Sequence, residues 1–142
     1  MTNLLEIGIV FRGFVIVNHK FKVISNVSST NIADDLRGAF IDAINSFAKS
    51  AFHNCSLEYL EMQNFLFIFK IGEVLAGDSN LKEPFIMYGL SKRRRNSDRF
   101  VKKFYEKLDF VMEFFTQKYA GEDFTEVQKF QDFKDDMKDY FS

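Results

Sequence analysis

Cysteine, histidine, proline and tryptophan are scarce in this 142-residue chain, which has one cysteine, two histidines, one proline and no tryptophan. The lone Cys55 cannot form an internal disulfide, and His19 and His53 are too far apart for zinc-ligand spacing. We therefore expect a protein of the reducing cytoplasm without a structural metal. With 46% hydrophobic residues and so little proline, long disordered linkers are not expected either.

Long uninterrupted apolar runs are also missing. The apolar start, LLEIGIVFRGFVIV, is broken by Glu6 and Arg12 and has no basic leader, which argues against a signal peptide or a membrane-spanning helix. The length suits one domain, so we expect residues 1–142 to share a single hydrophobic core.

A phosphate-binding loop is excluded by the residues around the first glycines. Gly8 and Gly13 have the required spacing, but Phe14 and Val15 stand where lysine and serine or threonine would hold phosphate and magnesium. We interpret the two residues as a strand glycine and a turn glycine.

Catalytic sets are missing as well. The sequence has no nucleophile elbow, no zinc-protease motif and no paired cysteines. The adjacent pairs Asp34–Asp35 and Asp135–Asp136 would not face each other on a helix, which argues against acid–base chemistry. His19, His53 and Cys55 are interpreted as structural residues, so we expect a protein that is not an enzyme and binds no cofactor.

Apolar periodicity is the strongest positive signal. Strand-like alternation and helix-like spacing predict the order strand, strand, helix, three strands, helix, helix, at residues 4–11, 14–24, 32–52, 55–62, 64–71, 85–90, 98–119 and about 123–141. Hairpins dominate this order, which indicates an α+β fold with an antiparallel-rich sheet. Strands 64–71 and 85–90 are apolar on both faces and should be central, whereas 14–24 and 55–62 are mixed and should be edges.

The helix expected at 98–119 has an unusually wide apolar arc. Phe110 and Phe114 lie beside its main stripe, so another segment should cover that flank. The natural candidate is the last helix, for which Thr125 and Gln128 have capping-box spacing. Residues 72–84 are expected to form a long connection.

Three stretches carry a resemblance to a known family. IVFRGFVIVNHKF, MQNFLFIFKI and SDRFVKKFYEKLDFVMEFFTQKY resemble the first hairpin, the third-to-fourth strand passage and the following helix of the longin domain. The resemblance implies a profilin-like five-stranded sheet in the order 2-1-5-4-3, with the first helix on one face and the later helices on the other. The related roadblock domain begins with a helix, whereas this chain enters a strand almost at once.

The longin resemblance also implies a function. Longin domains are non-enzymatic platforms in membrane traffic and small-GTPase regulation, and they make contacts through the sheet edge and the first helix. The resemblance thus implies a protein partner, such as a small GTPase or a trafficking subunit, or a homodimer. The long connection at 72–84 departs from the family pattern, and no SNARE heptad segment follows the domain.

A basic cluster interrupts a chain whose net charge is only -1. Seven cations fall within twelve residues: Lys92, Arg93, Arg94, Arg95, Arg99, Lys102 and Lys103. They are expected at a helix N-terminus, where cations oppose the helix dipole, so helix stability does not explain them. A solvated surface, an acidic protein and an anionic membrane remain open, while nucleic acid fits poorly with a slightly acidic chain.

Two further alternatives concern the rest of the chain. The acidic tail from Glu122 to Asp139 could lie over the basic cluster. The nineteen phenylalanines could instead line a cavity between sheet and helices, which would make the protein a small-ligand or lipid-binding domain.

Overall fold

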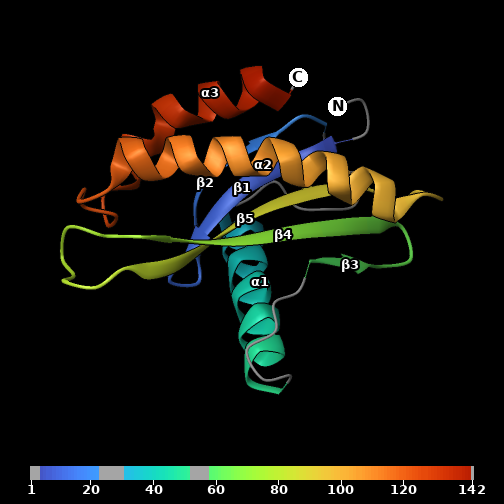
Figure 1. Ribbon diagram of the computed structural model, residues 1–142, viewed down its shortest axis with the longest axis horizontal. Helices are drawn as coiled ribbons and strands as arrows, with labels where there is room; N and C mark the ends of the chain where they lie inside the picture. The colour runs from blue at the N-terminus through green and yellow to red at the C-terminus, as the bar shows by residue number, and fades with distance from the viewer. Residues whose placement is uncertain (1–3, 23–30, 52–57, 142) are drawn as a thin grey trace.

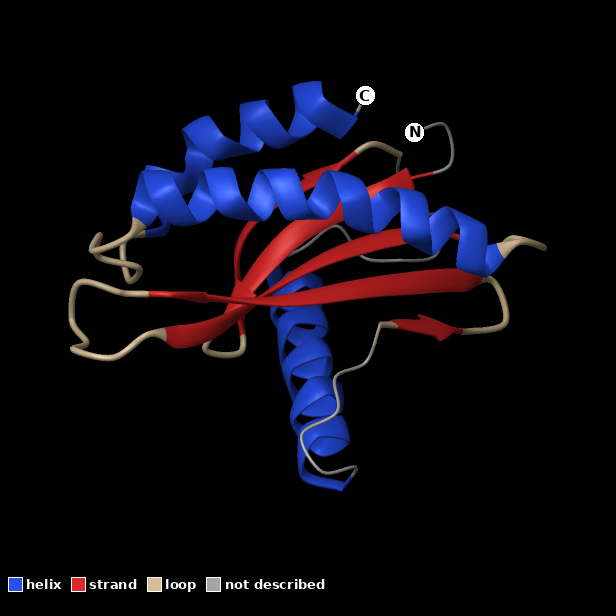
Figure 2. Ribbon diagram, in the orientation of Figure 1, coloured by secondary structure: helices blue, strands red, loops and turns tan. Residues whose placement is uncertain are grey.

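The computed structural model describes residues 4–22, 31–51 and 58–141 and shows an α+β fold (Figure 1). Its elements are β1 (Leu4–Phe11), β2 (Phe14–Lys20), α1 (Asn31–Ala51), β3 (Tyr59–Glu61), β4 (Phe65–Val74), β5 (Glu83–Lys92), α2 (Ser97–Tyr119), the 3-10 turn η1 (Val127–Phe130) and α3 (Gln131–Phe141). Helices α2 and α3 lie side by side over one face of the sheet, and α1 lies on the opposite side (Figure 2).

The five strands pair in the order β2-β1-β5-β4-β3, and all four pairings are antiparallel. This confirms the predicted fold class and strand order. The edges are also where the mixed patterns placed them, because β2 and β3 are the outer strands. Every residue of β1 is buried, as expected for a strand inside a sheet that carries helices on both faces.

Two glycines make room for large rings at the two surfaces of the sheet. A Cβ on Gly8 would lie 2.6 Å from the Tyr88 ring, and one on Gly89 would lie 2.4 Å from the Phe104 ring. Such distances are far below van der Waals contact, so each ring occupies the space that a side chain would need. Gly89 thereby lets α2 pack closely on β5.

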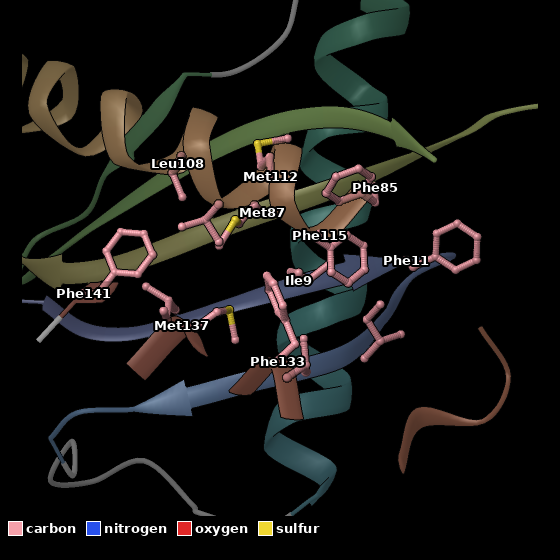
Figure 3. Close-up of a cluster of buried hydrophobic side chains, with 14 of the residues drawn as sticks. Ile9, Phe11, Phe85, Met87, Leu108, Met112, Phe115, Phe133, Met137 and Phe141 are labelled. Atoms are coloured by element: carbon pink, nitrogen blue, oxygen red, sulfur yellow. The ribbon is translucent and has the colours of Figure 1, made fainter. Parts of the chain in front are cut away.

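The main core lies between the sheet and the two C-terminal helices (Figure 3). The sheet, α2 and α3 each contribute buried side chains to it, including Ile9, Phe85, Met87, Leu108, Met112, Phe115, Phe133, Met137 and Phe141. Phe115 is central, with ring centroids 5.2 Å from Phe85 and 5.1 Å from Phe133. One hypothesis from the sequence placed a ligand cavity between the sheet and the helices. In the structure, these aromatic rings pack against one another in that layer.

The apolar spacing of Leu36, Phe40 and Phe47 predicts that they form the buried face of α1, but the helix buries a different face. Ile41 is fully buried against the second core cluster, on the other face of the sheet. Leu36 and Phe47, by contrast, are each 67% exposed, and Phe40 is 40% exposed. The later turns of α1, which include Phe47, extend away from the sheet (Figure 1).

Several predicted boundaries need correction. Strand β4 runs to Val74 and pairs there with Glu83, so the predicted connection at 72–84 shrinks to residues 75–82. The capping box is wrong, because Asp123 accepts hydrogen bonds from the Thr125 amide at 2.9 Å and its hydroxyl at 2.6 Å, and α3 begins only at Gln131. Strand β3 is also shorter than the predicted 55–62, of which residues 55–57 lie outside the described part of the chain.

Candidate anion-binding site at the start of helix α2

The basic cluster forms the junction between the last strand and the long helix. Strand β5 ends at Lys92 and α2 begins at Ser97, so residues 93–96 make the connection, as predicted. The Arg93 amide donates to the Asn64 carbonyl at 3.1 Å, which ties this junction to the β3–β4 turn. In Figure 1 the junction lies at the end of α2 that α3 does not reach.

Two of the arginines are engaged with neighbouring side chains. Arg93 lies 3.8 Å from the Glu61 carboxylate, and the Arg94 guanidinium carbon lies 4.2 Å above the Phe100 ring. Ser97 also donates a hydrogen bond to Glu61. These contacts fix the path of the junction and leave the remaining cations to face solvent.

Four of the basic residues converge on one hollow of about 490 Å³. Its lining consists of Arg94, Arg95, Asn96, Arg99, Phe100 and Lys103. Arg99 and Lys103 lie four residues apart on one face of α2, and Arg95 lies in the turn just before the helix begins. Lys92 is exposed at the strand end and Lys102 points elsewhere on α2, so neither lines this hollow.

The helix itself adds positive potential at the same place. Asn96 precedes the first turn of this 23-residue helix and makes no side-chain capping hydrogen bond. Amide N–H groups at a helix N-terminus carry a partial positive charge of about +0.5 in total. Guanidinium groups and free amides together form an environment that favours phosphate or carboxylate oxygens.

The nearest acidic side chains already have partners. Tyr59 donates to Asp98 at 2.6 Å, and this hydrogen bond raises the pKa of Tyr59 above its ordinary value. Glu61 accepts from Ser97 and pairs with Arg93. Within the residues that the structure describes, Arg95, Arg99 and Lys103 form no ion pair, so their charge is available to a ligand.

The acidic tail does not cover this site. Asp136 pairs with Lys118 at 3.5 Å, and Glu122 pairs with Lys129 at 3.3 Å. The last residue of α3, Phe141, packs against Phe104 with ring centroids 5.3 Å apart. Helix α3 thus ends beside the middle of α2, and the prediction that the tail could lie over the basic cluster is wrong.

A buried polar network near α1 was missed from the sequence. Glu6 is only 1% exposed and accepts hydrogen bonds from Arg37 of α1 and from the Tyr88 hydroxyl of β5. The sequence showed Glu6 only as an interruption of an apolar strand. Because a buried carboxylate needs a partner, Glu6 within a buried strand indicated that a cationic side chain from another element would pair with it.

Several of the residues considered for chemistry lie in the described part of the chain and can be placed. Gly8 lies in β1 and Gly13 in the β1–β2 turn, as interpreted from the sequence. Within the described residues, no group of three potential metal ligands occurs. His19 packs against Phe21, with ring centroids 4.6 Å apart, while His53 and Cys55 lie outside the described residues.

Comparison with protein-family models, with curated proteins and with solved structures finds no match for this chain. Among the helices that the structure describes, none combines the length and apolar character needed to cross a bilayer.

Proposed function

We propose that this protein is a non-enzymatic interaction platform of the longin type, which contacts an anionic membrane surface through the start of α2. The observation that carries the proposal is the hollow in which Arg94, Arg95, Arg99 and Lys103 converge beside a helix N-terminus. In this role the chain acts in the cytoplasm, peripherally at membranes, and brings a small GTPase or a trafficking subunit to that surface.

The charge at this site is sufficient for reversible membrane contact. Each lysine or arginine near an anionic bilayer contributes about 1 kcal/mol. Four converging cations would therefore contribute about 4 kcal/mol, which corresponds to roughly a thousandfold increase in affinity. This attraction falls within a Debye length of about 8 Å at physiological salt, so binding must weaken as salt rises.

Lipid phosphates fit this site better than nucleic acid does. Arginine and helix amides recognise phosphate oxygens. A nucleic-acid site would also benefit from an aromatic face for base stacking. The one ring in the hollow, Phe100, is 5% exposed and covered by Arg94, and the chain as a whole carries a net charge of -1.

The platform part of the proposal is supported by the arrangement of the elements. The strand order and the division of helices between the two faces agree with what the longin resemblance implies. The proposal of a GTPase or trafficking partner depends on that resemblance.

Co-sedimentation with vesicles tests the membrane contact. Wild-type protein should bind vesicles that contain phosphatidylserine or a phosphoinositide and should not bind phosphatidylcholine vesicles. Replacing Arg95, Arg99 and Lys103 together by serine should reduce binding roughly a hundredfold, because about 3 kcal/mol of attraction is removed.

A charge-matched control separates this site from net charge. Lys49, Lys82 and Lys138 are exposed elsewhere, and their joint replacement by serine removes the same charge. That control should bind almost as wild type does. If both triple variants lose binding equally, or if neither does, the start of α2 is not the docking site.

A further inference from the structure

The outer side of α2 carries two phenylalanines that α3 covers only in part. Phe110 is 60% exposed and Phe114 is 43% exposed, and Tyr140 of α3 is 37% exposed beside them. The wide apolar arc of α2 predicted that the last helix would cover this flank. Helix α3 does pack there, but it leaves three large aromatic side chains in contact with solvent.

These side chains line a groove between the two helices with a volume of about 360 Å³. Its walls consist of Phe110, Val111, Phe114, Phe133, Asp136, Asp139 and Tyr140. Phe110 stacks on Tyr140 at 5.2 Å between centroids, and Phe114 stacks on Phe133 at 5.9 Å. Paired rings of this kind lose little conformational entropy when a partner binds, so the groove is largely preformed.

The charged side chains in the groove favour a ligand that carries positive charge. Of the described residues that line it, Asp136 and Asp139 are the ones with carboxylate side chains, and no lysine or arginine is among them. Lysines of the chain itself already lie over rings at both ends, with Lys107 5.5 Å from Tyr140 and Lys118 5.9 Å from Phe114. Lys118 also pairs with Asp136, whereas Asp139 has no ion pair among the described residues.

We propose that this groove binds a basic amphipathic helix of a partner protein. Apolar side chains of that helix would lie between the rings of α2 and α3, and its lysines or arginines would reach Asp139. A helix suits the site because α2 and α3 lie side by side and a third helix can pack in the groove between them (Figure 1). This site is separate from the basic hollow and does not depend on the proposed membrane contact.

A second copy of the chain would complement this surface less well. A two-fold dimer places the same patch on both sides of the interface, so each acidic rim would approach a surface that carries the same carboxylates. A basic helix supplies the opposite charge and the apolar face together.

Fluorescence anisotropy with designed peptides tests the proposal. The probe is a labelled 18-residue helix of leucine and lysine with leucines at helical spacing, and the comparison peptide carries glutamate in place of lysine. The full chain should bind the lysine peptide and not the glutamate peptide. Asp136→Asn with Asp139→Asn should weaken binding about fivefold or more, because it removes both carboxylates from the lining of the groove.

Matched variants make the test specific. Phe110→Ser with Phe114→Ser should abolish peptide binding, whereas Phe14→Ser, at a 62% exposed position on β2, should not change it. Asp132→Asn with Asp135→Asn removes the same charge from α3 outside the groove and should leave affinity within about twofold. Thermal melts establish that each variant is folded.

Three results would overturn the proposal. The first is equal weakening by the groove pair and the control pair of aspartates. The second is unchanged peptide affinity in the folded double phenylalanine variant. The third is a dimer, seen by light scattering, that the phenylalanine variant dissociates, because the groove would then be a self-association surface.

Discussion

Replacing Arg37 by methionine should destabilise the fold strongly, because it removes the cationic partner of a buried carboxylate. Glu6 is 1% exposed, and its two partners are Arg37 and the Tyr88 hydroxyl. Breaking a buried ion pair from one side typically costs about 3–5 kcal/mol. We expect the lower part of that range, about 3 kcal/mol, because the Arg37 side chain is 11% exposed and Tyr88 still donates to Glu6.

The double variant Glu6→Leu with Arg37→Met should recover most of this loss. Removing both partners leaves no uncompensated charge, and apolar replacements of buried ion pairs are often neutral or stabilising. The double-mutant cycle should therefore show a coupling of about 2 kcal/mol or more. In a domain of this length the single variant should melt roughly 10 °C lower than wild type.

Urea unfolding monitored by circular dichroism measures the free-energy cost of Arg37→Met and the coupling energy of the double-mutant cycle. Lys49→Met is the matched control, since Lys49 is an exposed cation on the same helix and its loss should cost less than about 0.5 kcal/mol. A cost below about 1 kcal/mol for Arg37→Met would refute the buried network. A double variant that is no more stable than Arg37→Met would also refute it.

Three further predictions concern stability. Gly89→Ala should cost about 1–3 kcal/mol in urea unfolding, since its Cβ would meet the Phe104 ring at 2.4 Å; a neutral result would contradict the close packing of α2 on β5. Tyr105→Phe should cost about 1 kcal/mol, because the single hydroxyl hydrogen is shared between the Phe69 and Glu58 carbonyl oxygens, which lie 2.7 and 2.8 Å from the hydroxyl oxygen; an unchanged denaturation midpoint would argue against this hydrogen bond. Burial, with Lys134 and Lys138 nearby and Asp135 opposing them, lowers the pKa of His19, so protonation favours the unfolded chain. Stability from His19 is present above about pH 6.5 and is lost as pH falls through the lower folded pKa, so the stability of wild type relative to His19→Asn should decrease on acidification; a pH-independent difference would exclude this effect.

The central and edge positions in the sheet could be predicted because the strands differ in how many faces they bury, whereas the full strand order was implied by the longin resemblance. The apolar runs at 64–71 and 85–90 belong to β4 and β5, which are interior strands, and the mixed runs belong to the edge strands β2 and β3. The basic junction was also predictable, because four consecutive cations cannot be buried without partners.

Contacts between distant elements could not be predicted in the same way. Hydrophobic spacing identified α1, but it could not show which face of α1 packs on the sheet, so that Ile41 is buried and Leu36 is exposed. The pairing of Glu6 with Arg37 depends on that placement. Similarly, the pattern of α2 indicated a covered flank, but it could not show that α3 leaves Phe110 60% exposed beside Tyr140.

The most direct test of the proposed membrane contact is an NMR map of the chain on lipid nanodiscs. Backbone amide signals would be compared between anionic discs that carry a paramagnetic headgroup label and neutral discs with the same label. We predict signal loss over residues 94–103 on anionic discs only, and we expect these signals to keep their full intensity in the variant with serine at Arg95, Arg99 and Lys103. Signal loss centred on α1 or on the groove between α2 and α3, or no loss at all, would contradict it.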